Sequence, residues 1–419
     1  EVDTHEPFIP PTWAYKYHDG DLPNRSLMPE GNNFWWIEIG GTGDTIAQTE
    51  VHRDELLKIA YGVWDYIKNH PDGRGHRWEL EWIGNLPGKR ESARYVGDHI
   101  LTQGDIEAEG RFEDMVAYGG WTMDDHHPAA IHWPGPPTIW HPAPSPYGIP
   151  YRCLYSANIE NLFFAGRNIS VTHMALSSTR VMGTCALLGQ AVGTAAALAV
   201  AHGCSPRAIY RHHIAELQAQ LMDDDCYLPW HRRPIPAISG TARLTASMGD
   251  PEPLRSGIDR SLGGEDNGWW GTAGAWVEYR FPAPVALQRA RFTFDSDLAA
   301  LKRMPCSYPA QVQRGRIPSQ MTRAFELQVQ DAAGAWRTIH RIEDNHQRLV
   351  KIPLSVTTSA VRFVPLAGWG GALAFAALAN LLLAAGVAWW LRSQARDLLF
   401  EATLRHLRRT AGAGEGDTA

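Results

Sequence analysis

The feature that most limits the fold of this chain is an alternation of apolar and polar residues over residues 239–366. A period of two is typical of strands that bury one face. The segments with this alternation are 276–281, 291–298, 324–331, 336–342, 348–354 and 360–366, with a turn at 331–335. Several short strands separated by turns predict an all-β sandwich or jelly roll.

The first 228 residues mix helical patterns with irregular segments. Apolar residues at helical spacing predict an amphipathic helix over 53–69 and another helix over 205–228. The intervening segment 119–150 is rich in His, Pro, Trp and Gly, and a loop of that length is usually functional or disordered. The Pro-rich segment 229–236 is typical of a linker.

A short apolar run at 161–166 leads into a stretch at 181–201 that is apolar on nearly all sides. The run predicts a buried strand followed by a turn, and the stretch predicts a helix. Three hydroxyl residues are candidates to cap this helix: Ser177, Ser178 and Thr179. Three glycines inside it each cost about 1 kcal/mol relative to Ala, so we expect a backbone or a ligand to pack closely against them: Gly183, Gly189 and Gly193.

Residues 366–391 contain no charged residue, and their number suits a membrane span of about 20 residues. Arg392 and Arg396 follow, which would place the main body of the protein outside the cytoplasm. We therefore expect a transmembrane helix at 367–391 and a tail at 392–419. In the alternative interpretation, 373–378 is the last strand of the sandwich and the rest is a buried helix.

Composition excludes several classes of partner. The net charge of −6 and the lack of a basic stripe argue against a nucleic-acid partner. The five cysteines are far apart and form no C-x-x-C, which argues against a zinc site, an iron–sulfur site and a disulfide framework. No metal site is predicted, and the oligomeric state is not indicated. The chain starts at Glu1, so we expect a fragment or a processed product.

Three groups of motifs, in order along the chain, resemble one family. The motifs are LPGKRES at 86–92 with Gly97, Asp98 and LTQ at 101–103; PYGIPYRCL at 146–154; and NLFFAGRNIS at 161–170 with TRVMGTC at 179–185 and GQA at 189–191. They resemble the FAD-dependent oxidoreductases that are distantly similar to the flavoprotein subunit of heterodisulfide reductase, some of which are labelled xanthan lyase. Residues 239–366 resemble the discoidin- or galactose-binding-like module that often follows.

The resemblance implies a fold class. Residues 1–228 would be an α/β domain of the glutathione-reductase-like FAD fold, followed by a linker at 229–238 and the β-sandwich at 239–366. This sequence has no G-x-G-x-x-G turn to hold the ADP part of FAD, because the glycines of 40–43 lack the third spacing. We therefore expect the nucleotide-binding N-terminal part of the fold to be missing.

The resemblance also implies residues that contact FAD. A helix that starts near Thr179 would point its N–H groups and its dipole at the reduced flavin. Gly166 would allow close approach of the backbone. The implied cofactor-binding residues are Gly166, Arg167, Asn168, Thr179, Arg180, Val181, Met182 and Gly183. The alternative is a strand–turn–helix packed for stability alone.

The candidates for catalysis are two histidines that could move a proton, His127 in the long loop and His173 after the second FAD motif. The alternatives are a solvated loop for the first and a core histidine for the second. Candidate substrate-binding residues are cationic or aromatic side chains that suit anionic or sugar-like molecules: Arg90, Tyr147, Tyr151 and Arg152. Arg90 could equally form a surface ion pair with Glu91 or Asp98.

We therefore expect a flavoenzyme that takes hydride from a small organic substrate of the carbohydrate class, with FAD as cofactor and an extracytoplasmic, membrane-anchored location. One alternative is a glycan-binding protein on a degenerate flavoprotein scaffold. A second is a membrane-tethered structural fragment whose only partner is another chain.

Overall fold

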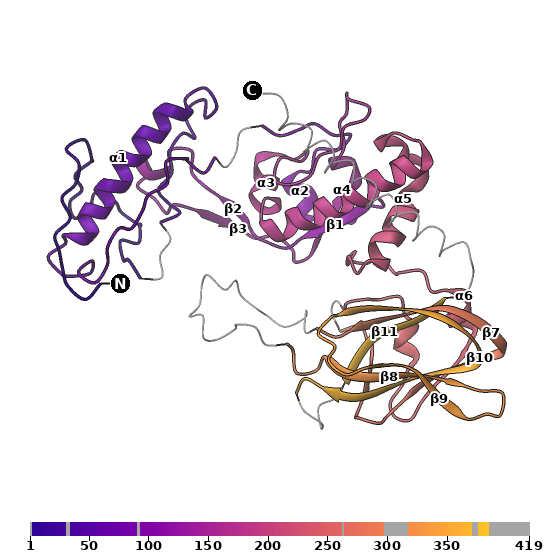
Figure 1. Ribbon diagram of the computed structural model, residues 1–419. Helices are drawn as coiled ribbons and strands as arrows, with labels where there is room; N and C mark the ends of the chain where they lie inside the picture. Colours follow the sequence, from indigo (N-terminus) through magenta and orange to yellow (C-terminus); the bar gives the residue numbers. More distant parts are fainter. Residues whose placement is uncertain are drawn as a thin grey trace, which may run out of the picture. The chain divides into compact units, whose positions relative to one another are not determined.

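A computed structural model describes residues 2–30, 34–89, 93–261, 264–296, 317–370 and 376–384 (Figure 1). The chain divides into two compact units, one of 1–193 with 205–212 and one of 194–204 with 213–419. Helices α4 (Met182–His202) and α5 (Pro206–Asp223) therefore contribute residues to both units. Each unit is described separately below.

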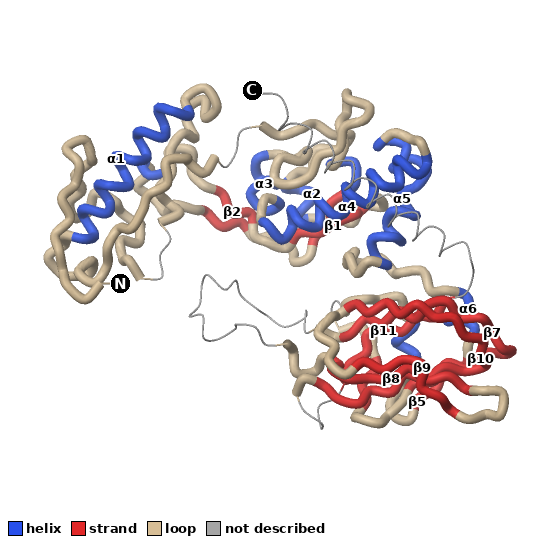
Figure 2. Tube along the Cα trace, in the orientation of Figure 1, coloured by secondary structure: helices blue, strands red, loops and turns tan. Residues whose placement is uncertain are grey.

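The first unit consists mainly of helices and long loops (Figure 2). Its strands form two small antiparallel pairs, β1 (Met115–Gly119) with β4 (Tyr147–Pro150) and β2 (Met123–Asp125) with β3 (Ile139–His141). The short helices α2 (Gln103–Glu107) and α3 (His173–Thr179) complete it, together with the 3₁₀ turns Ala130–His132 and Tyr151–Cys153.

Helix α1 (Thr49–Lys68) confirms the helix predicted over 53–69. It buries a stripe of Ile59, Val63 and Ile67, which are spaced four residues apart and so share one face. The stripe packs on Leu22, Trp36 and Ile131, so the helix anchors both the N-terminal loops and part of the long loop. The helix predicted over 205–228 is also confirmed, as α5.

The segment that precedes α4 differs from the prediction. Residues 161–166 form only an isolated bridge, between Tyr155 and Phe163, and not a strand. Gly166 has φ +92°, which supports the predicted turn, because a left-handed backbone favours glycine. The three hydroxyl residues proposed as caps of α4 lie inside α3, which is instead capped by the side chain of Thr172.

No backbone packs closely against the glycines of α4 in the described part of the chain, so of the two predicted partners only a ligand stays a prediction. A Cβ added at Gly183, Gly189 or Gly193 would meet no atom within 4 Å in the described part of the chain. The buried stripe of α4 lies on another side of the helix, at Leu188, Ala191, Ala195 and Ala199. One face of this apolar helix is therefore exposed, and it is a face of small residues.

The second unit confirms the predicted β-rich fold. Its described strands form one seven-stranded antiparallel sheet in the order β6-β11-β7-β10-β8-β9, with β5 paired to β7. The strands are β5 (Arg243–Ala246), β6 (Trp269–Gly271), β7 (Val277–Phe294), β8 (Thr322–Gln330), β9 (Trp336–Ile342), β10 (Leu349–Gly368) and β11 (Ala376–Ala384). Two further short helical segments are α6 (Ala237–Thr241) and the 3₁₀ turn Glu252–Arg255.

Two long strands each contain two of the predicted segments. Strand β7 joins the alternation at 276–281 to that at 291–298, and β10 joins 348–354 to 360–366. The register shifts along their pairing, between Pro353 and Val356 and between Thr358 and Ala360. Such bulges bend a strand, so one long strand can serve two sides of a core. The core is aromatic, with ring centroids 5.2–6.2 Å apart among Phe292, Phe294, Phe325 and Phe363.

The membrane prediction is wrong for its central part. Residues Ala376–Ala384 form β11, which pairs with β6 and β7, whereas the prediction for these residues is a transmembrane helix. The rest of the predicted span, at 371–375 and 385–391, lies outside the described residues, as does the tail at 392–419. A different helix, Met182–His202, is long and apolar enough to cross a membrane, but core helices pass the same test, so this is weak evidence.

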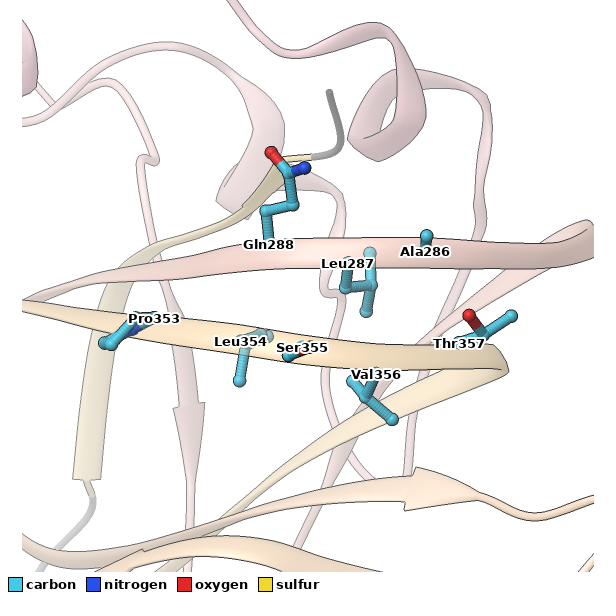
Figure 3. Close-up of a pocket in the computed structure, with 8 residues that line it drawn as sticks. All are labelled: Ala286, Leu287, Gln288, Pro353, Leu354, Ser355, Val356 and Thr357. Carbon is cyan, nitrogen blue, oxygen red and sulfur yellow. The ribbon is translucent and has the colours of Figure 1, made fainter. Parts of the chain in front are cut away.

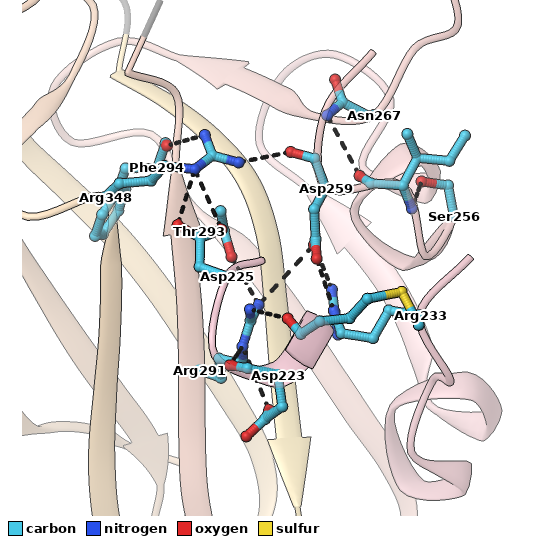
Figure 4. Close-up of polar contacts among 12 residues, drawn as sticks. Asp223, Asp225, Arg233, Ser256, Asp259, Asn267, Arg291, Thr293, Phe294 and Arg348 are labelled. Atoms are coloured by element: carbon cyan, nitrogen blue, oxygen red, sulfur yellow. Dashed lines mark hydrogen bonds and ion pairs between the residues drawn. The ribbon is translucent and has the colours of Figure 1, made fainter. Parts of the chain in front are cut away.

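A buried polar network fastens the end of α5 and the predicted linker to the sheet (Figure 4). Arg233, from the linker, forms a buried ion pair with Asp259, with Nη2–Oδ1 2.8 Å. Arg291 of β7 is fully buried and donates to the carbonyl oxygens of Met222 and Asp223 at 2.9 and 3.1 Å. The linker region is therefore held in place by buried charges.

Candidate functional site

A cluster of acidic residues and histidines lies where strand β2 meets helix α3 in the first unit. Asp124 and Asp125 are the last residues of β2, and His173 is the first residue of α3. His173 Nε2 lies 2.9 Å from Asp125 Oδ1, and half of the His173 side chain is exposed. A carboxylate at one ring nitrogen fixes the tautomer and the orientation of the ring, so this pair has the arrangement of a general base.

Asp124 is the centre of a second set of contacts. Its carboxylate lies 3.0 Å from Arg180 Nη2 and 3.2 Å from His126 Nε2, and it accepts a hydrogen bond from the Thr138 hydroxyl. Burial alone would raise the pKa of Asp124, but the hydrogen bonds and charges of these neighbours outweigh burial and hold the pKa below its usual value. Asp124 is therefore a carboxylate that fixes Arg180 in place.

His126 is held at both ring nitrogens, since its Nδ1 lies 2.7 Å from Glu38 Oε2. Trp35 packs edge-on against the His126 ring, with centroids 5.3 Å apart. On the β2–β3 side, Trp121 and Trp140 form a second edge-to-face pair at 6.1 Å. All three tryptophans are exposed, so aromatic surface lies in the same part of the unit as the charged groups.

Of the two histidines predicted to be catalytic, the structure brings only His173 into this cluster. The His127 ring stacks on Trp133 at 4.0 Å, and its Nδ1 accepts a hydrogen bond from the Ala129 N–H. His127 thus stabilises a turn of the long loop. Sequence reasoning did not select Glu38, Asp124, Asp125 or His126 as site residues; the signal was the adjacent acidic and histidine pairs at 124–127.

The predicted substrate-binding residues have other partners. Tyr147 and Tyr151 are fully buried and are hydrogen-bonded to the Ser178 hydroxyl and to the Pro206 carbonyl. Arg152 forms a bidentate pair with the buried Asp114, with both N–O distances 2.9 Å. These contacts stabilise the fold and do not suit the substrate role predicted for the three side chains. Arg90 lies outside the described residues.

The start of α4 is open enough to receive a ligand. Met182 is 84% exposed, and an added Cβ at Gly183 would meet nothing within 4 Å. The first N–H groups of any α-helix lack partners within the helix. Just before this helix, the buried Thr179 hydroxyl has no hydrogen-bond partner among the described residues. Gly166, on the preceding turn, is equally open, with only Asn168 Oδ1 at 3.7 Å from an added Cβ. These residues fit the flavin end of FAD, which needs backbone donors and close approach.

The glycines at 40–43 do not form a phosphate cradle. A Cβ at Gly41 would lie 2.4 Å from the Pro128 carbonyl oxygen, so this glycine permits two backbone segments to pack together. Gly40 has φ +94° and adjoins the ring of His52. Both glycines are explained by packing.

The motif at 97–103 supports the fold. Asp98 accepts two hydrogen bonds from Arg207, at 2.7 and 2.6 Å, and one from the Tyr155 hydroxyl at 2.8 Å. A Cβ at Gly97 would lie 2.4 Å from the Arg152 carbonyl oxygen. Close packing therefore requires a glycine at position 97. Asp98 has a structural role, because it pairs with Arg207.

The Asp98 pair predicts a dependence of stability on pH. The hydrogen bonds from Arg207, followed by that from Tyr155, lower the pKa of Asp98 in the folded state. A lowered pKa stabilises the fold fully above the unfolded pKa of about 3.9, and the effect is lost as pH falls through the folded pKa. We expect Asp98→Asn to unfold at lower urea concentration than wild type at pH 6, with the difference shrinking as pH falls below about 4. A difference that stays constant down to the lowest pH would contradict this.

The second unit contains a shallow pocket of about 420 Å³ beside the bulge of β7 and β10 (Figure 3). It is lined by Ala286, Leu287, Gln288, Pro353, Leu354, Ser355, Val356 and Thr357. These side chains include no aromatic ring and no charge. The polar side chains of the lining are Gln288, Ser355 and Thr357, so the pocket offers an amide and two hydroxyls but no aromatic platform and no charge.

Comparisons with known proteins give one family and a set of solved structures. The family described as FAD dependent oxidoreductase matches residues 3–221.

A family 32 carbohydrate-binding module of Streptococcus pneumoniae EndoD is 17% identical, with 36% of this chain and 99% of the module covered and a TM-score of 0.27. A family 32 module from Clostridium perfringens, in complex with GalNAc-β-1,3-galactose, is 17% identical, with 35% and 97% covered and a TM-score of 0.24. Chitosan-binding module 1 of a Paenibacillus chitosanase/glucanase is 13% identical, with 37% and 99% covered and a TM-score of 0.25. No curated protein matches this chain.

Proposed function

Because this chain belongs to the FAD dependent oxidoreductase family, we propose that it is a flavoenzyme that oxidises a small organic substrate of the carbohydrate class. The observation that carries the proposal is the His173–Asp125 pair, which lies in the same unit as the open start of α4. Oxidation of an alcohol removes a hydride and a proton. When bound, FAD would accept the hydride.

His173 would take the proton from the substrate hydroxyl. Its Nε2 faces Asp125, so the proton would be received at Nδ1, and the carboxylate would stabilise the charged ring. The half-exposed side chain can be reached from outside the protein. His126 would take no part in proton transfer and would only help to hold Asp124 in place, because Glu38 and Asp124 contact its two ring nitrogens.

The residues at the start of α4 would hold the flavin. Gly166 and Gly183 would allow close approach, and the Thr179 hydroxyl would gain a partner. The guanidinium of Arg180 is fixed by Asp124. It would add positive charge near N1 and the 2-carbonyl of the flavin, which become negative when the flavin is reduced. Arg167, Asn168, Val181 and Met182 complete the proposed cofactor contacts.

The aromatic surface supports the proposed substrate class. The exposed rings of Trp35, Trp121 and Trp140 present apolar faces beside polar groups. Such a combination suits a molecule with apolar C–H faces and many hydroxyls. A carbohydrate has both. In this proposal the three tryptophans would bind the substrate, and His173 would remove its proton.

The proposal is tested by the visible absorption spectrum of the purified chain after incubation with FAD and gel filtration. Because this sequence has no G-x-G-x-x-G turn, the test uses the chain alone and the chain joined to an upstream segment that carries this turn. We expect the joined form to retain flavin absorbance and Gly183→Leu in the same form to lose it, because the leucine would fill the space at the start of α4. Gly189→Leu is the matched control, since it lies on the same helix in equally open space. Both changes remove a helical glycine, so neither should destabilise the helix.

Equal retention of flavin by wild type and Gly183→Leu would place FAD elsewhere on the chain. Absence of flavin from both the chain alone and the joined form would reject the flavoenzyme and favour the alternative of a glycan-binding protein on a degenerate scaffold. Circular dichroism spectra of both variants would verify that the helices are intact.

A further inference from the structure

The turn between α4 and α5 brings together two histidines and a glutamate. His202 is the last residue of α4, and His213 and Glu216 lie on α5. One nitrogen of each imidazole and one oxygen of the carboxylate all lie within 4.8 Å of one another. We propose that these three residues form a site for a divalent transition-metal ion of the Zn²⁺ class, which joins the end of α4 to α5.

The distances fit a single ion. His202 Nε2 lies 2.9 Å from Glu216 Oε2, and His213 Nδ1 lies 3.4 Å from the same oxygen. Two ligand atoms of a tetrahedral zinc ion with bonds of about 2.0–2.1 Å are roughly 3.3 Å apart. The two nitrogen–oxygen separations are therefore near the separation that one ion requires, and all three ligand atoms lie within 4.8 Å of one another.

The backbone holds the ligands in place. His213 and Glu216 are three residues apart on α5, so their side chains share one face of the helix. Gly203, directly after His202, has φ +60°, a conformation that ends α4 with a sharp turn. The Cys204 N–H donates to the Ala199 carbonyl at 2.9 Å, which fixes this turn. The ligands thus come from two helix segments with defined geometry, as preorganised metal sites require.

The donor set selects the metal. Two imidazole nitrogens and one carboxylate oxygen suit Zn²⁺, Ni²⁺ or Cu²⁺, whereas Mg²⁺ and Ca²⁺ prefer oxygen ligands alone. The His202 and His213 rings are stacked, with centroids 3.8 Å apart and an interplanar angle of 18°. About one third of the Glu216 and His202 side chains is exposed, so an ion can enter from solvent.

The test is calorimetric titration of the full chain, first treated with EDTA and desalted, with ZnCl₂ and in parallel with MgCl₂. We expect one tight Zn²⁺ site in wild type and none for Mg²⁺. His202→Gln and Glu216→Gln should weaken the tight site by about 100-fold or more, because each removes a direct ligand and loss of even an indirect one costs about 10–100-fold. The matched control is His212→Gln, the neighbouring histidine on α5 that is not one of the three ligands, and it should bind Zn²⁺ as wild type does.

The chain contains 18 histidines, so weak Zn²⁺ binding elsewhere is expected, and only the tight site is diagnostic. The proposal is overturned if wild type has no tight site, or if His212→Gln weakens it as much as His202→Gln does. A measurement on wild type alone does not depend on the folding of any variant: Zn²⁺ should protect His202 and His213 from modification by diethyl pyrocarbonate, as read by mass spectrometry. Unchanged modification of both residues would equally overturn the site.

Discussion

Replacement of His173 by Gln is expected to slow the reduction of bound FAD by substrate about 10²- to 10⁴-fold, the range that general acid–base catalysis contributes. The proton of the substrate hydroxyl would lose its acceptor, while the proposed flavin contacts at the start of α4 would remain. The FAD absorbance retained by the variant should therefore equal that of wild type. The measurement is anaerobic stopped-flow absorbance with a panel of aldoses and sugar alcohols.

His127→Gln is the matched control, because His127 stacks on Trp133 and lies outside the cluster at β2. We expect it to leave the rate of flavin reduction close to that of wild type. Asp125→Asn should lower the rate through His173, since the amide cannot stabilise a protonated ring as a carboxylate does. If His127→Gln were slow and His173→Gln were not, the proton would move through the long loop and the assignment to His173 would be wrong.

The helices and strands that could be predicted from the sequence are those in which buried apolar residues recur at regular spacing. The stripe of Ile59, Val63 and Ile67 repeats at helical spacing, and α1 buries that stripe. The alternation of apolar and polar residues within β7 and β10 likewise predicts strands, because each strand faces an aromatic core on one side. The two strands were each predicted as two, since a bulge interrupts the alternation without ending the strand.

The membrane prediction shows where composition fails. Ala376–Ala384 has the apolar composition of part of a membrane span, yet it forms a strand. The composition of a short apolar segment does not distinguish a buried strand from part of a helix. Only pairing with β6 and β7, which lie far away in the sequence, distinguishes the two. The length and composition of a segment cannot supply that information, because it depends on a partner strand.

The candidate site was predictable only in part for a similar reason. His173 and Arg180 follow from motifs, but their partners Asp125 and Asp124 come from a strand about 50 residues earlier. Local reasoning selected His127 in the long loop, whereas the structure stacks the His127 ring on Trp133. The proposed metal ligands were missed because they come from two helices and match no local spacing of cysteines or histidines.

Replacement of Arg291 by Met is expected to destabilise the second unit by about 3–5 kcal/mol, the cost of breaking a buried ionic network from one side. Arg291 is fully buried on β7, donates to the carbonyl oxygens of Met222 and Asp223, and donates to the Thr293 hydroxyl at 2.7 Å. Methionine would fill much of the volume but would leave these acceptors without a donor. Burial lowers the pKa of Arg291 and the nearby charge of Arg233 adds to this, while neighbouring aspartates favour the charged form.

The matched control is Arg341→Met, which removes an arginine of the same sheet from an exposed position on β9. Its ion pairs with Glu326 and Glu343 are accessible to water and salt, so its loss should leave the midpoint of urea unfolding nearly unchanged. Unfolding should be followed by tryptophan fluorescence and circular dichroism together, because two units can unfold in separate transitions. If both variants shifted the midpoint equally, the buried network of Figure 4 would contribute no more than a surface ion pair, and the end of α5 would be held to the sheet by apolar packing instead.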